Sequence, residues 1–249
     1  MKTNLFAWII LAVICFSSCP CFSGEFQGKI LKTKGEVLIR NNKGVERTPA
    51  ASDYIAISDE AINTRSGGKA VVKFTNGSMT VIGENSSLGI EKPTLFRQLK
   101  GKILFAFAKS NGPTRMVQTD SAVFAVRATY FVVDKNESGE SLALKEGLIN
   151  VEAPKGSFEI HQKKEQNELD AYKAEMEKGV KEIKKEGAKF IQQEKDDFVT
   201  FKQSFLVKPD EMITLHGNRV DQGSMGPAEK ASFDDLEEFG GDLIKNYRK

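Results

Sequence analysis

The chain has little cysteine, and all of it lies at the amino-terminal end. Its 249 residues include three cysteines, which are Cys15, Cys19 and Cys21. The rest of the chain therefore has no disulfide framework, no thiolate metal site and no cysteine nucleophile. Packing alone must stabilise the fold.

Residues that usually carry chemistry are also scarce. The two histidines, His161 and His216, do not form an HExxH pattern, and we interpret them as surface imidazoles rather than as metal ligands. Nucleotide-binding glycine motifs and the GxSxG serine motif are absent from the sequence. We predict no catalytic residue, no cofactor and no metal, so the protein is not expected to be an enzyme.

Net charge provides no argument for a nucleic-acid partner. Lysine and arginine number 36 against 34 aspartates and glutamates, which gives a formal net charge of +2. Any electrostatic partner would have to be recognised by a local patch of charge. We expect no nucleic acid among the partners.

The amino terminus predicts export. Met1 and Lys2 precede an apolar run of about a dozen residues, Leu5 to Phe16, which is too short for a membrane span of about 20 residues. We predict a signal peptide over residues 1–23 with cleavage before Gly24. The alternative is a loose lipobox that ends at Cys19, which would then be the lipidated residue. The expected location is the periplasm, the outer membrane or the cell surface, with a lipid anchor as the only membrane attachment.

Most of the chain has a strand-like pattern. Lys69 to Ile82 predicts two strands joined by Asn76-Gly77, which favours a type I′ turn. Apolar residues alternate along the first of these strands. Ile103 to Ala108 is apolar at every position, as in a strand with both faces buried. Similar short segments reach Ile160 and are separated by Gly and Asn turns, so we predict an all-β sandwich or roll.

Seven motifs in this region resemble, in order, the pattern of the FecR domain family. They are Gly35-Glu36-Val37; Asp59 to Thr64 with Gly67 to Ala70; Phe74 to Ser78; Asn85 to Leu88; Leu99 to Ile103; Val126 to Phe131; and Glu146 to Val151. The resemblance implies an antiparallel two-sheet sandwich of jelly-roll type outside the cytoplasm. It also implies kinship with an envelope transducer that passes iron-siderophore signals from an outer-membrane receptor to a sigma factor.

The sequence departs from that family pattern in ways that limit the comparison. It has a signal sequence where the transducers have a cytoplasmic segment and a spanning helix, so we do not expect an anti-sigma role inside the cell. Ala128 replaces the glycine of the V-R-G-T motif. Arg127, next to it in an apolar strand, is expected to form a structural ion pair, with Asp59 as the candidate partner.

Residues 162–204 predict a long inserted helix. The segment lacks proline, is rich in charge and repeats apolar residues at intervals close to 3.6. Two interpretations stay open, a solvated arm or a helix that docks a partner or a second copy. The candidate docking face consists of Leu169, Tyr172, Met176, Val180, Ile183, Phe190, Phe198 and Phe201.

The predicted organisation is therefore a signal peptide (1–23), a FecR-like β-domain (24–161), the inserted helix (162–204), closing strands of the same domain (205–222) and a linker with an amphipathic tail (223–249). The tail is expected to form a short helix that packs on its own domain. The favoured function is a non-enzymatic protein-interaction or signalling module of the cell envelope. The alternative is a periplasmic or surface sandwich that binds a small ligand or a glycan.

Overall fold

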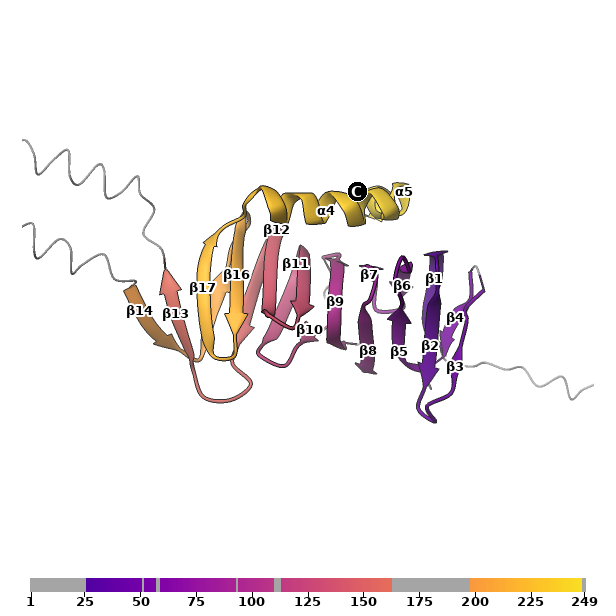
Figure 1. The fold of residues 1–249 in the computed structure, drawn as a ribbon, viewed down its shortest axis with the longest axis horizontal. Coiled ribbons are helices and arrows are strands. Elements are labelled where there is room, and N and C mark those ends of the chain that lie inside the picture. The colour runs from indigo at the N-terminus through magenta and orange to yellow at the C-terminus, as the bar shows by residue number, and fades with distance from the viewer. Residues whose placement is uncertain are drawn as a thin grey trace, which may run out of the picture.

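The protein is mainly β, as predicted (Figure 1). A computed structural model describes residues 26–50, 52–56, 59–92, 94–109, 113–162 and 198–247. The described strands are β1 (Phe26–Lys34), β2 (Val37–Asn41), β3 (Glu46–Arg47), β4 (Tyr54–Ala56), β5 (Asp59–Thr64), β6 (Lys69–Phe74), β7 (Ser78–Ile82), β8 (Ser87–Lys92), β9 (Leu95–Phe107), β10 (Arg115–Gln118), β11 (Val123–Asn136), β12 (Gly139–Glu152), β13 (Phe158–Gln162), β14 (Phe198–Lys202), β15 (Ser204–Val207), β16 (Glu211–His216) and β17 (Arg219–Ser224). The described helices are α4 (Pro227–Gly240) and α5 (Asp242–Tyr247). Neither of these two helices has the length and apolar character needed to span a membrane.

The strands form one connected sheet with two rows of pairing. The first row runs β4-β1-β6-β7-β9-β11-β12-β16-β17-β13-β14. The second row runs β3-β2-β5-β8-β9-β10-β11-β12-β15. Nearly all pairs are antiparallel, and only β9 with β10 and β13 with β17 are parallel. The three long strands β9, β11 and β12 belong to both rows and connect them.

Each of these long strands changes row near a residue with positive φ. These residues are Gly101 in β9 (φ +82°), Ala128 in β11 (+53°) and Gly147 in β12 (+93°). A Cβ on Gly101 would lie 2.1 Å from Oγ of Ser86, and one on Gly147 would lie 2.3 Å from the carbonyl oxygen of Ala128. At both glycines, where the strand passes from one row to the other, the neighbouring atoms leave no space for a side chain. We call the three positions corners. All three positions fall within motifs that carried the family resemblance.

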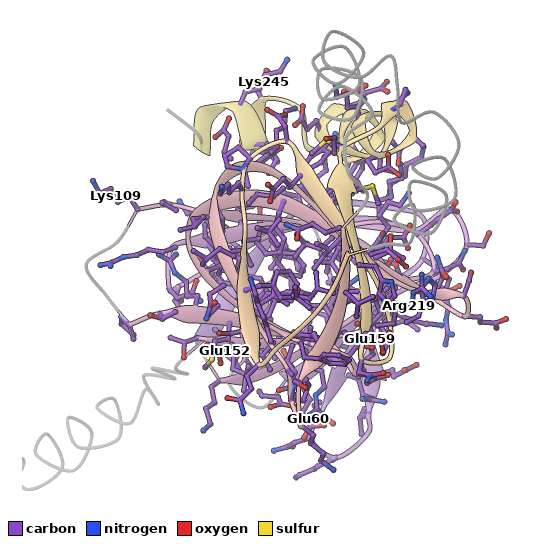
Figure 2. The ribbon with its side chains drawn as sticks, turned by 90° about the vertical axis from the view of Figure 1, so that its left-hand side faces the viewer. Glu60, Lys109, Glu152, Glu159, Arg219 and Lys245 are labelled. Atoms are coloured by element: carbon purple, nitrogen blue, oxygen red, sulfur yellow. The ribbon has the colours of Figure 1, made fainter. Side chains whose placement is uncertain are left out.

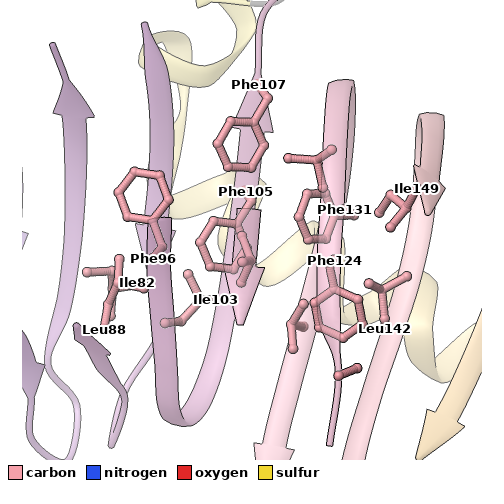
Figure 3. Packing of buried hydrophobic residues seen from close by; sticks show 14 of the residues in the cluster. Ile82, Leu88, Phe96, Ile103, Phe105, Phe107, Phe124, Phe131, Leu142 and Ile149 are labelled. Carbon is pink, nitrogen blue, oxygen red and sulfur yellow. The ribbon is translucent and has the colours of Figure 1, made fainter. Parts of the chain in front are cut away.

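One apolar core lies between the two rows (Figure 3). Phe105 and Phe131 from the first row have ring centroids 5.2 Å apart, and Phe96 and Phe124 enter the same cluster from the second row. Viewed along the long axis, the interior between the strands is filled with side chains (Figure 2). The core therefore requires both rows.

A second cluster covers the outer face of the first row. Val71 on β6 and Leu104 on β9 point away from the main core and pack with Phe233 and Leu236 of α4. Both faces of β9 are consequently buried from Ile103 to Phe107, as predicted for these residues, whereas Ala108 is exposed. The tail packs on its own domain. Helix α4 begins at Pro227, and proline fits the first helical position.

The predicted inserted helix is not supported at its ends. Residues 163–197, which include Leu169, Tyr172, Met176, Val180, Ile183 and Phe190 of the docking face, lie outside the described residues. Gln162 ends β13, Phe198 and Phe201 belong to β14, and Ser204 begins β15. The helical prediction is wrong for these positions. Phenylalanine, valine and threonine favour strands, and β13 offers them a pairing partner.

Candidate interaction surface

The predicted pair of Arg127 with Asp59 does not form. Arg127 is exposed, because its neighbour Val126 enters the core and the next side chain along a strand points to the opposite face. Asp59 is buried and pairs instead with Arg47, whose Nη2 lies 3.0 Å from a carboxylate oxygen of Asp59. The ion pair of Asp59 is therefore with Arg47 and not with Arg127.

Arg47 joins three segments at one end of the second row. It also forms an ion pair with Asp53 and donates a hydrogen bond to the carbonyl oxygen of Tyr54 at 2.8 Å. Burial disfavours the charged guanidinium, but the hydrogen bonds that Arg47 donates to Asp59 and Asp53 outweigh this effect, so the pKa of Arg47 is raised. The arrangement stabilises the β3–β4–β5 region.

The serines in the motifs have structural roles. Ser86 donates to the carbonyl oxygen of Glu84 at 2.9 Å and accepts a hydrogen bond from the backbone N–H of Lys102 at 3.0 Å. Ser87 donates to Asn63 Oδ1, and Ser78 donates to Asn76 Oδ1, both at 2.6 Å. These contacts connect turns to neighbouring strands, and none of them pairs a hydroxyl with a histidine base.

Both histidines lie at the far end of the molecule near Asp221. His161 Nε2 is 2.9 Å from a carboxylate oxygen of Glu159, and His216 ends β16. The hydrogen bond from Arg219 is the main reason that the pKa of Asp221 is lowered, and the charges of the two histidines add to it. Within the described part of the chain, no three acidic, histidine or cysteine side chains are arranged to hold a metal ion.

Apolar side chains are exposed at the same end of the molecule. Leu148 on β12 and Leu206 on β15 are 46% and 50% exposed on the outer face of the second row. Phe201 on β14 is 70% exposed, so the only member of the predicted docking face with a described side chain is open to solvent. Contiguous apolar patches mark interaction surfaces, whereas single exposed apolar residues are normal, so these three residues alone do not define a site.

A lysine-rich face at the opposite end was missed by sequence reasoning. Lys29, Lys32 and Lys34 on β1 lie beside Lys69 and Lys73 on β6. Three lysines close together in β1 were the available signal in the sequence, but the pairing of β1 with β6 was not predicted. A shallow groove of about 460 Å³ adjoins this face, lined by Lys32, Thr33, Lys34, Lys69, Asp235, Glu238 and Phe239.

Comparison with known proteins identifies one family and two structures. Residues 60–150 match the family model described as FecR protein. Two crystal structures of an inferred anti-sigma factor from Parabacteroides distasonis ATCC 8503, at 2.50 Å and 1.65 Å resolution, are similar to the chain with 12% and 11% identity and TM-scores of 0.46 and 0.45. The matches cover 70% and 69% of this chain and 63% and 62% of those chains, so this chain spans less than two thirds of their length. No curated protein matches the sequence.

The family match includes the structural features described above. It begins in β5 and ends in β12, and it therefore contains the three row-changing corners at Gly101, Ala128 and Gly147. The resemblance seen in the sequence motifs is confirmed for this region. Over residues 60–150 the chain is therefore similar to the FecR family.

Proposed function

We propose that this protein is a non-enzymatic interaction or signalling module of the cell envelope, in which the β-domain is a rigid scaffold. The FecR match supports a signalling-related role. The two rows of strands around one core are consistent with the antiparallel jelly-roll type that the family resemblance implies. The apolar run at Leu5 to Phe16 supports an extracytoplasmic location.

One geometric observation carries the proposal. Gln162 and Phe198 are direct partners in the antiparallel pair of β13 and β14, so the segment 163–197 starts and ends at adjacent points of one hairpin. A long insertion between close ends is tolerated at small entropic cost to the scaffold. The β-domain can therefore carry residues 163–197 as a recognition element, with its docking face, without a change in its own core.

A loop-closure variant tests this proposal. Residues 163–197 are replaced by Asn-Gly, which suits a two-residue hairpin between β13 and β14. We expect the same cooperative unfolding as for the full chain but loss of the partner that crosslinks to the full chain in the envelope. A second variant keeps the length of the segment and changes Leu169, Met176, Val180 and Ile183 to Ser. It should lose the same partner, which would assign recognition to these side chains and not to the length of the insertion.

Two outcomes would contradict the proposal. Equal crosslinking of the partner by the full chain and by both variants would show that the insertion does not recognise it. A cytoplasmic location, or a mature protein with an intact amino terminus and no lipid, would remove the envelope role. Cell fractionation gives the location of the protein. Mass spectrometry of its amino terminus distinguishes cleavage before Gly24 from lipidation of Cys19.

A further inference from the structure

The lysine face combines like charges on adjacent strands. In the pairing of β1 with β6, Lys34 lies directly opposite Lys69, and Lys29 lies directly opposite Lys73. Like charges that face each other across a strand pair destabilise a sheet. Two such pairs occur here in a chain whose formal net charge is only +2. This strand pair therefore carries a local concentration of lysine that the small net charge does not reveal.

Only part of this charge is compensated within the protein. Lys69 forms an ion pair with Asp235 of α4 at 2.8 Å. Lys32 donates a hydrogen bond to the carbonyl oxygen of Phe239 at 2.8 Å, and its ammonium lies 4.6 Å from the centre of the Phe239 ring. Both contacts hold the ammonium groups in place, but a carbonyl and a ring do not neutralise Lys32.

The remaining lysines have even fewer contacts. Lys29 lies over the ring of Tyr54, with its ammonium 5.4 Å from the ring centre. Lys34 and Lys73 are exposed, and neither forms a hydrogen bond or an ion pair with any residue in the described ranges. Asp235 and Glu238 are the carboxylates that line the adjacent groove. Asp235 is paired with Lys69, so Lys32 and Lys34 share the groove with one further carboxylate, Glu238.

The geometry points to an anionic phospholipid surface as the partner of this face: we infer that Lys29, Lys32, Lys34 and Lys73 bind the headgroup phosphates of a bilayer. Lys69 is held by Asp235 beneath α4 and supports the face without contacting the bilayer. A sheet presents its side chains on a broad surface, so several ammonium groups can contact separate phosphates at once. Tyr54 is 50% exposed at the edge of this face, and an exposed aromatic ring suits the boundary between headgroups and acyl chains. In addition, β1 is the first described strand after the apolar run of the amino terminus, so an anchor at Cys19 would hold this face near the bilayer.

The inference is independent of the proposed function. The lysine face lies near one end of the row of strands, whereas the β13–β14 hairpin lies at the other end (Figure 1). Changes at the lysines leave residues 163–197 intact, and loop closure leaves the lysines intact. Failure of one proposal can therefore be observed while the other holds.

Vesicle co-sedimentation tests this inference. The protein used begins at Gly24, which retains every described residue and removes the apolar run. Vesicles of phosphatidylcholine with phosphatidylglycerol should bind it, and vesicles of phosphatidylcholine alone should not. Binding should be lost when the salt is raised from about 0.1 M to about 1 M, because the Debye length falls from about 10 Å to about 3 Å.

Paired variants make the test specific. Each lysine near an anionic bilayer strengthens binding about fivefold, so Lys34→Gln with Lys73→Gln should weaken it by about 25-fold. The control, Lys155→Gln with Lys208→Gln, makes the same charge change at exposed lysines elsewhere and should bind as the wild type does. The backbone N–H of Lys208 donates to Glu211, and this contact is retained in the variant. Thermal melting of both variants checks that each is folded.

Three results would overturn the inference. Equal binding to neutral and anionic vesicles would show that the lysines do not bind the lipid through its negative charge. An equal loss in the control variant would show that net charge, and not this face, is responsible. Retention on a heparin column without vesicle binding, abolished by Lys34→Gln with Lys73→Gln, would assign the face to an acidic polymer instead of a bilayer.

Discussion

Replacing Ala128 with glycine should stabilise this protein, although the change removes a methyl group from a half-buried position. Ala128 has φ of +53°, a left-handed conformation that L-residues with a side chain disfavour. It lies where β11 passes from one row of strands to the other, and its carbonyl oxygen lies against Gly147 of β12. The corner therefore imposes the conformation, and the side chain bears the strain.

The magnitude follows from two opposing effects. A left-handed conformation costs an L-residue about 1–2 kcal/mol. Glycine makes the unfolded chain more flexible, which costs about 0.4–1 kcal/mol. We therefore expect Ala128→Gly to raise the free energy of unfolding by roughly 0.5–1 kcal/mol. For a domain of this size, that corresponds to an increase of about 1–4 °C in the melting temperature.

Equilibrium urea unfolding and thermal melting measure the effect. The matched control is Ala125→Gly on the same strand, which is also half-buried but has ordinary backbone dihedral angles. That change should destabilise the protein by about 0.5–1 kcal/mol, as glycine does within strands. Equal destabilisation by the two variants would refute the reasoning, because it would show that Ala128 carries no backbone strain.

Four further predictions follow from other contacts. Gly147→Ala should cost about 2–4 kcal/mol in urea unfolding, because its Cβ would lie 2.3 Å from a carbonyl oxygen; an equal loss for Gly217→Ala, which has φ of +65° and open space, would contradict this. Phe233→Ala should cost about 3–5 kcal/mol, whereas Phe201→Ala, at a side chain 70% exposed, should change stability by less than about 0.5 kcal/mol; similar values for both would mean that α4 does not cover the sheet. Arg47→Ala should cost about 1–3 kcal/mol because buried Asp59 loses its ionic partner, and Arg219→Ala, which removes an exposed ion pair with Asp221, is the comparison that should cost less, under about 1 kcal/mol at neutral pH. The pKa of Asp221 lies below its usual 3.8, so its stabilising effect is present above about pH 4 and is lost as the pH falls through the lowered value; Arg219→Gln should abolish this part of the acid dependence, and unchanged acid unfolding curves would exclude it.

Local patterns predicted the strands better than the turns. The alternation in Lys69 to Phe74 is confirmed, because Val72 and Phe74 enter the main core while Lys73 is exposed. The hairpin at Asn76-Gly77 is also confirmed, but its type I′ turn is wrong. Of the two residues only Gly77 has positive φ, and its N–H donates to the carbonyl oxygen of Phe74 at 3.1 Å, which makes a three-residue loop with a left-handed glycine.

The errors at the candidate sites come from contacts between distant segments. Phe198 and Phe201 continue a helical period along the chain, yet β13 pairs with them and makes them strand. Asp59 lies 12 residues from Arg47 and is joined to it only when β3 and β5 come together around β2. The lysine face likewise exists only because β6 pairs with β1.

The sequence by itself determined the mainly β composition, the alternation of buried and exposed residues, the position of the central hairpin and the motifs of the FecR segment. These features depend on side-chain period and on turn residues within a few positions of one another. The tertiary structure decided which half of each long strand joins which row, which cation partners Asp59, and where five lysines meet. Those outcomes depend on the pairing of segments far apart in the chain, and a local pattern carries no information about which partner a strand will take.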